Sequence, residues 1–176
     1  MNKIIAIDGP ASVGKSTLAK MLAEKYNAPI LFSGKLYRAI ALELIKRKSN
    51  PNNIQNVLEC VDCIDLNKLD SKELYLREVD KLSSIISSKK KLRNKLTTLQ
   101  RNFPKQYGKK SKFAIIEGRD IGTVIFPDAD YKIFLWADAK IRAKRRYEQI
   151  KKNRKKASFR RIFSEINTRD RKDLTR

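Results

Sequence analysis

An eight-residue stretch near the N-terminus constrains the fold most. It reads Gly-Pro-Ala-Ser-Val-Gly-Lys-Ser over residues 9–16, after an apolar run at 4–7 and before a helical pattern with Leu18, Met21 and Leu22 on one face. The pattern G-x-x-x-x-G-K-[ST] between a strand and a helix is typical of a phosphate-binding loop. Its glycines let successive backbone N–H groups point inward, and the start of the helix adds partial positive charge. The sequence therefore predicts a strand–loop–helix unit that binds nucleotide phosphates.

The residues of this loop form the candidate ATP site. We expect Lys15 to reach the β- and γ-phosphates and Ser16 to bind Mg²⁺ through its hydroxyl. Arg145, in a later basic helix, belongs to a segment expected to close over ATP and exclude water. The remaining expected ATP contacts are Gly9, Pro10, Ala11, Ser12, Val13, Gly14 and Thr17.

Apolar runs and helical patterns alternate along much of the chain. This alternation implies an α/β fold whose parallel sheet is flanked by helices. Two short runs, at 63–66 and 73–76, predict a small hairpin outside the sheet. The predicted strands of the sheet are 3–8, 29–32, 113–117 and 131–137, and the predicted helices are 15–26, 54–61, 79–87, 91–103 and those that begin near 33, 139 and 158.

We expect one domain with three parts, because 176 residues can bury one core and leave room for an insert. The core comprises about 1–33 and 113–140. The insert, about 34–112, is expected to bind the acceptor nucleotide, and the basic region at about 141–176 is expected to act as a lid.

Charge is the strongest compositional signal, because 41 basic and 19 acidic residues give a formal net charge of +22. Such an excess attracts either nucleic acid or a small phosphorylated substrate. Lysines on solvated faces produce the same excess without a site, and lysine doublets near expected loops favour that interpretation for most of them. The sequence carries no RNA-binding motif and no basic surface interleaved with aromatic residues, so no nucleic-acid partner is expected.

Membrane insertion and zinc binding are not expected. The apolar run at 4–7 is too short for a signal-peptide core or a membrane span, and we expect a cytoplasmic monomer. Cys60 and Cys63 form a lone C-x-x-C motif in a sequence without histidine, so a tetrahedral zinc site lacks half its ligands. Both cysteines are expected to face a core, with a redox role as the alternative.

Arginines at particular positions are the best candidates for phosphate chemistry. Phosphoryl transfer needs positive charge around the equatorial oxygens, and the planar guanidinium binds phosphate in a bidentate manner. Arg38 lies one turn into the helix after the second strand. Arg119 follows the third strand beside Asp120, where open α/β sheets bind ligands. Near the end of the sequence, Arg169, Arg171 and Arg176 alternate with Asp170 and Asp173.

Several motifs besides the phosphate loop occur in a characteristic order. The most specific is Glu-Gly-Arg-Asp-Ile-Gly-Thr-Val-Ile-Phe-Pro at 117–127. The others are Ile-Asp-Gly-Pro at 7–10, Gly-Lys-Ser-Thr at 14–17, Ser33-Gly34 with Tyr37-Arg38, Leu99-Gln100-Arg101, and Arg169-Asp170 with Asp173 and Arg176. Over residues 3–176 the chain resembles bacterial cytidylate kinases. The resemblance implies a P-loop kinase fold and ATP-dependent phosphorylation of CMP and dCMP to the diphosphates.

The resemblance also implies roles for individual residues. Lys15, Arg119, Arg169 and Asp120 would be catalytic, and the two arginines would neutralise charge on the acceptor phosphate and the transferring group. The implied acceptor residues are Ser33, Tyr37 and Arg38 on the monophosphate side, Ser84, Arg93 and Asp120 at cytosine and sugar, Arg119 at the phosphate, and Asp173 and Arg176 at sugar and phosphate as the lid closes.

The sequence departs from this family pattern at a few positions. Phe32 stands where an aspartate is usual, which removes a polar or water-mediated Mg²⁺ contact there. Tyr75 replaces a common arginine of the insert, and Trp136 replaces an acidic residue at a strand end. The family continues past a position like Arg176 into a last strand and helix, so four strands with an unpaired edge are expected here.

Other functions are compatible with parts of the sequence. A catalytically impaired P-loop protein that binds nucleotide or nucleic acid is supported by the net charge and by Phe32. A kinase for UMP or AMP would share the same loop. A kinase for a small acceptor such as shikimate is disfavoured, because the long insert between Ser49 and Lys112 suits a nucleobase better than a small ring.

Overall fold

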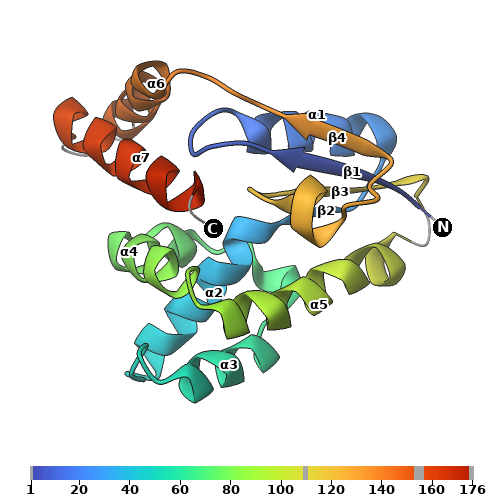
Figure 1. Ribbon diagram of the computed structural model, residues 1–176, viewed down its shortest axis with the longest axis horizontal. Coiled ribbons are helices and arrows are strands. Elements are labelled where there is room, and N and C mark those ends of the chain that lie inside the picture. Colours follow the sequence, from blue (N-terminus) through green and yellow to red (C-terminus); the bar gives the residue numbers. More distant parts are fainter. Residues whose placement is uncertain (1, 109–110, 153–156, 175–176) are drawn as a thin grey trace.

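A parallel four-stranded sheet lies at the centre of the protein (Figure 1). The computed structural model describes residues 2–108, 111–152 and 157–174. The strand order is β2-β3-β1-β4, and β1 pairs with both β3 and β4. This confirms the α/β class and the four strands. The strands are β1 (Lys3–Asp8), β2 (Ile30–Phe32), β3 (Phe113–Glu117) and β4 (Tyr131–Phe134).

The sheet is buried on both faces because apolar residues run continuously along its central strands. Successive side chains of a strand point to opposite faces. Ile5 and Ile7 of β1 pack with Ala19 against the first helix, whereas Ala6 between them packs on the opposite side with Leu36 and its neighbours. Helices therefore cover both faces of the sheet (Figure 1).

Most helices occur where apolar periodicity predicts them. Helix α1 follows the phosphate loop, but Met21 is 62% exposed, so only part of its predicted apolar face packs on the sheet. Helices α2 to α5 cover the other face, and α6 and α7 pack together to one side around Ala143, Ile162 and Ile166 (Figure 1). The helices are α1 (Lys15–Tyr26), α2 (Ser33–Lys46), α3 (Ile54–Asp62), α4 (Arg77–Ile86), α5 (Lys90–Tyr107), α6 (Ala139–Lys152) and α7 (Phe159–Leu174).

The predicted hairpin in the insert is wrong. Two 3₁₀ turns stand there instead: η1 (Leu66–Lys68) begins at the end of the first run, and η2 (Lys72–Tyr75) overlaps the second. The Ser71 hydroxyl accepts a hydrogen bond from the Glu73 N–H at the start of η2, which favours a helical turn over an extended strand. Leu74 of this turn is buried, so the apolar run that predicted a strand belongs to a turn packed on the core.

The two cysteines have different environments. Cys60 is buried as expected, and burial raises the pKa of its thiol. Cys63 is exposed, which contradicts the prediction that it faces a core. Its sulfur lies just past the end of α3, where the Arg47 guanidinium donates to it at 3.0 Å.

Most elements end within two residues of the expected positions, and the ends of β4 and α5 differ most. Strand β4 ends at Phe134 and not at residue 137, because only Tyr131–Phe134 pairs with β1. Helix α5 continues past Phe103 to Tyr107 with Pro104 inside it. Within the described residues, no helix is both long and apolar enough to span a membrane.

Candidate active site

The phosphate loop joins the end of β1 to the start of α1 through residues with positive φ. Gly9 has φ of 143° and Gly14 has φ of 109°, values that an L side chain rarely adopts. A Cβ at Gly9 would also collide with the carbonyl group of Leu135, which follows β4. Sterics therefore explain why glycine occupies both positions of the motif. The predicted strand–loop–helix unit is confirmed.

Lys15 is buried within this loop, with only 7% of its surface exposed. Its ammonium donates to the Pro10 carbonyl at 2.9 Å and lies 3.7 Å from a carboxylate oxygen of Glu117. The Ser16 hydroxyl donates to the other oxygen of that carboxylate, also at 2.9 Å. Glu117 thus contacts both of the loop's functional side chains, although the sequence analysis assigned it no role. Its signal was its place at the carboxyl end of β3, paired with Ile7 of β1.

The electrostatics of Lys15 show that charged groups converge on the loop. Burial lowers the pKa of Lys15 from 10.5 to about 8, and the nearby charges of Arg119 and Arg169 lower it further while Glu117 raises it. Arg119 follows β3 and Arg169 belongs to α7, so the fold brings two predicted catalytic arginines towards the predicted catalytic lysine.

Carboxylates pair with the predicted phosphate-binding arginines. The Arg119 guanidinium donates to the Asp173 carboxylate of α7, and both side chains are largely buried. Arg38 donates to the carboxylate of Asp80 in α4, and Arg169 lies 3.9 Å from the same carboxylate oxygen. Charged residues from α2, α4 and α7 therefore meet at the Asp80 carboxylate.

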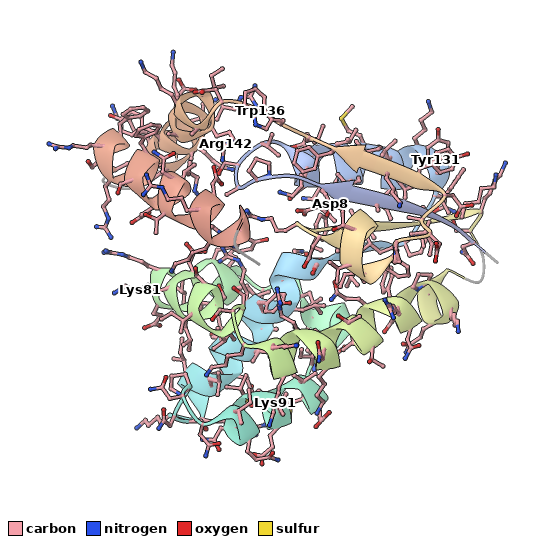
Figure 2. The ribbon with its side chains drawn as sticks, viewed as in Figure 1. Asp8, Lys81, Lys91, Tyr131, Trp136 and Arg142 are labelled. Carbon is pink, nitrogen blue, oxygen red and sulfur yellow. The ribbon has the colours of Figure 1, made fainter. Side chains whose placement is uncertain are left out.

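Arg142 is a candidate site residue that the sequence analysis missed. It lies on α6, is 3% exposed, and donates to the Ala11 carbonyl of the phosphate loop at 3.1 Å. It also donates to the Asp170 carboxylate of α7 at 2.5 Å, so it links α6 and α7 to the loop (Figure 2). Arg145, predicted to bind ATP, is exposed on the same helix, and its role stays a prediction. The signal available in the sequence was its place directly before the apolar Ala143 in α6.

Asp8 positions the segment that follows β3. This buried carboxylate accepts hydrogen bonds from the N–H groups of Ile121 and Gly122, at 2.8 Å and 2.7 Å. Ile121 and Gly122 are the first two residues of η3 (Ile121–Ile125), a single π-helical turn near Asp8 (Figure 2). Arg101 of α5 donates to the carbonyl of Ile125 at the other end of that turn. These bonds fix the backbone just after Arg119. They give a structural role to Asp8 of the Ile-Asp-Gly-Pro motif and to Arg101 of the Leu-Gln-Arg motif.

The other predicted acceptor residues lie on several elements around this centre. Ser33 is buried and Tyr37 is half-buried on α2. Ser84 on α4, Arg93 on α5 and Asp120 before η3 are each half-buried. Their convergence on a cytosine ring stays a prediction. Arg176 lies outside the described residues.

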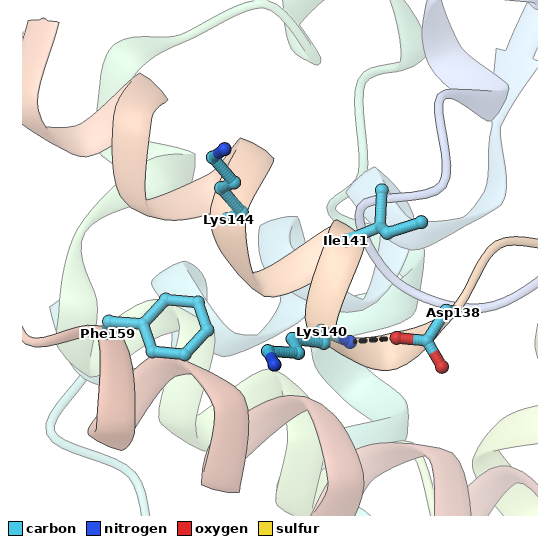
Figure 3. A pocket seen from close by; sticks show the side chains of 5 residues that line it. All are labelled: Asp138, Lys140, Ile141, Lys144 and Phe159. Atoms are coloured by element: carbon cyan, nitrogen blue, oxygen red, sulfur yellow. Dashed lines mark hydrogen bonds between the residues drawn. The ribbon is translucent and has the colours of Figure 1, made fainter.

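Two pockets lie away from the loop. One, of about 260 Å³, lies between the starts of α6 and α7 and is lined by Asp138, Ile141 and Phe159 with two lysines (Figure 3). In it the Asp138 carboxylate accepts a hydrogen bond from the Lys140 N–H and so caps the start of α6. The other, of about 620 Å³, lies in the insert beside Cys60 and Cys63. Neither lining includes a predicted site residue.

Known proteins of one family match nearly the whole chain. The cytidylate kinase family model matches residues 5–176. The chain is 37% identical over 191 residues to a cytidylate kinase of Caldicellulosiruptor saccharolyticus, covering 100% of this chain and 82% of that protein. It is 38% identical over 173 residues to a cytidylate kinase of Bartonella henselae, covering 98% of this chain and 79% of that protein.

A solved structure shares the fold. The crystal structure of TT1252 from Thermus thermophilus matches with a TM-score of 0.51 and 16% identity over 93% of this chain and 78% of that one. The sequence matches extend over nearly the whole chain and include the phosphate loop, the segment after β3 and α7. By these matches, the chain belongs to the cytidylate kinase family.

Proposed function

We propose that the protein transfers the γ-phosphoryl group of ATP to CMP and dCMP. The observation that carries this proposal is the geometry of the phosphate loop, where the buried Lys15 and the Ser16 hydroxyl both contact Glu117 at the end of β3. The charges of Arg119 and Arg169 are close enough to lower the pKa of Lys15. Phosphoryl transfer needs little covalent chemistry from a protein, and positive charge placed around the transferring group supplies most of the catalysis. Lys15 of the loop, Arg119 just after β3 and Arg169 of α7 supply such charge.

The two substrates would meet at this centre from opposite sides. ATP would place its phosphates on the loop amides and Lys15, while Arg142 and its Asp170 partner hold the lid against the loop backbone. The acceptor phosphate would bind on the side of Arg38 and Arg119. Closure of α6 and α7 over the site would exclude water, which otherwise competes with the acceptor.

The donors at the loop fit Mg²⁺. The Ser16 hydroxyl and the Glu117 carboxylate are 2.9 Å apart, and Mg²⁺ prefers such oxygen ligands together with phosphates and waters. When bound, the metal would neutralise charge between the β- and γ-phosphates. Because Phe32 supplies no carboxylate, we propose that Glu117 serves the metal in this chain.

Glu117→Gln is expected to raise the Mg²⁺ concentration for half-maximal rate by about tenfold, since it removes charge but keeps shape. The rate is measured against Mg²⁺ at saturating ATP, and Mn²⁺ binding to the protein with a non-hydrolysable ATP analogue is followed by electron paramagnetic resonance. Glu24→Gln on the exposed side of α1 is the matched control. An unchanged metal dependence in the Glu117 variant would remove it from the metal site.

A coupled assay over CMP, dCMP, UMP and AMP tests the proposed activity. CMP and dCMP are expected to have kcat/KM values at least about tenfold above those of UMP and AMP, since a site built for the cytosine edge leaves polar groups unpaired with other bases. Faster turnover of UMP or AMP would show that Ser84, Arg93 and Asp120 do not select cytosine. A monomeric state and a cytoplasmic location stay predictions.

A further inference from the structure

Asp80 connects two arginines that belong to different parts of the protein. It lies in the first turn of α4, and its carboxylate accepts a hydrogen bond from Arg38 of α2. The same oxygen lies 3.9 Å from Arg169 of α7. In Figure 1 the C-terminal end of α7 faces α4, so this carboxylate stands between the insert and the lid.

Packing and orientation do not explain this residue. The buried side of α4 is formed by Val79, Ser83 and Ile86, whereas the Asp80 side chain is 46% exposed. Arg38 is also held without it, because its guanidinium donates to the Leu74 carbonyl at 2.8 Å and lies 5.5 Å from the centre of the Tyr75 ring. A carboxylate that only oriented Arg38 would add little to these contacts.

The Asp80 carboxylate binds Arg38 in the way that a phosphate would. A guanidinium binds a carboxylate and a phosphate through the same N–H groups and with similar geometry. Arg38 and Arg169 carry like charges that repel each other across the gap between α2 and α7, and one anion between them offsets that repulsion. Asp80 supplies this anion from within the chain.

We propose that Asp80 is an internal substitute for the acceptor phosphate: it holds Arg38 and Arg169 together in the empty site and competes with the phosphate of the incoming nucleotide. The proposal rests on the proposed function, which places that phosphate beside Arg38. Asp80 is then a specificity-determining residue, because an acceptor must carry enough negative charge to displace a carboxylate. It also lowers the affinity for every phosphate-bearing ligand of this site.

The change in phosphate affinity on substitution of Asp80 shows whether this carboxylate competes with the phosphate or helps to bind it. Asp80→Asn keeps the shape and removes the charge, so CMP and inorganic phosphate are expected to bind about two- to fivefold more tightly, the effect of losing one partly exposed ion pair. Cytidine, which lacks the phosphate, is expected to bind unchanged. Affinities are measured by isothermal titration calorimetry at constant ionic strength.

Matched variants separate this effect from general charge and from folding. Asp62→Asn removes an equal charge from an exposed carboxylate that pairs with Lys95 on the far side of the insert, and it is expected to leave all three affinities unchanged. Asp80→Ser provides a second neutral variant, and thermal unfolding confirms that each variant is folded.

Each outcome of the titrations decides the proposal. The proposal would be overturned if folded Asp80 variants bound CMP and phosphate more weakly than the wild type or equally well. It would also be overturned if neither the wild type nor the variants bound these ligands. Equal tightening in Asp62→Asn, or of cytidine, would overturn it as well. The proposed kinase function is judged separately by turnover of CMP, so inactive wild-type protein whose phosphate affinity rises on substitution would refute that function and still support the role of Asp80.

Discussion

Replacing Lys15 with methionine is expected to lower kcat/KM for CMP phosphorylation by about 100- to 1,000-fold. A buried cation at the transferring phosphates acts where water does not screen it, and the loss of one such group typically costs this much. Methionine fills most of the lysine's volume, so the loop should keep its backbone. The coupled assay measures the rates.

Lys20→Met is the matched control, because Lys20 lies exposed on the same helix. It is expected to change kcat/KM less than about twofold. Near-normal turnover in Lys15→Met would contradict the role of the whole loop.

The same variant is expected to increase stability in the absence of nucleotide. Burial lowers the pKa of Lys15 from 10.5 to about 8, so the charged form is disfavoured in the folded state. Between pH 8 and 10.5 the unfolded chain binds more protons than the folded one, and the wild type therefore gains stability as the pH rises through this window. At pH 7 the full cost is present, and Lys15→Met should unfold with a free energy about 1–3 kcal/mol higher. Denaturant unfolding at pH 7 and pH 10 measures the difference, which should shrink at the higher pH.

Arg142→Ala is expected to produce the largest loss of stability. Arg142 is almost fully buried and pairs with the Asp170 carboxylate. Removal of one partner of a buried pair leaves the other charge without compensation, at a cost of about 3 kcal/mol. For a chain of this size the melting temperature should fall by roughly 6–10 °C. ATP binding should weaken as well, because the Ala11 carbonyl of the loop loses its link to α6.

Arg161→Ala provides the control within the same helical pair. It removes an exposed ion pair with Glu165 and should change the melting temperature by less than about 2 °C. Hydrogen exchange then locates the effect, with amides of α6 and α7 expected to lose protection only in the Arg142 variant. Equal melting temperatures for the two alanine variants would show that the buried pair does not hold α6 and α7 together.

Local patterns predicted the backbone well where one rule dominated. The phosphate loop, β1 and α1 follow from glycine spacing between an apolar run and a helical face, and β3 follows from its buried run. The insert was harder, since its short apolar runs near Leu74 fit a strand as well as a 3₁₀ turn. The exposed positions of Met21 and Cys63 show the same limit, because periodicity indicates an apolar residue but not whether anything packs on it.

The phosphate loop, the alternation of strands and helices, and the family could all be inferred from the sequence, because each depends on motifs of residues close together in the chain. Which charged side chains meet could be learned only from the folded chain. Glu117 contacts Ser16, Arg142 contacts Ala11, and Asp80 lies between Arg38 and Arg169 because packing brings separate elements together. Long charged side chains reach in many directions, and their partners are fixed by the folded backbone and not by spacing along the sequence.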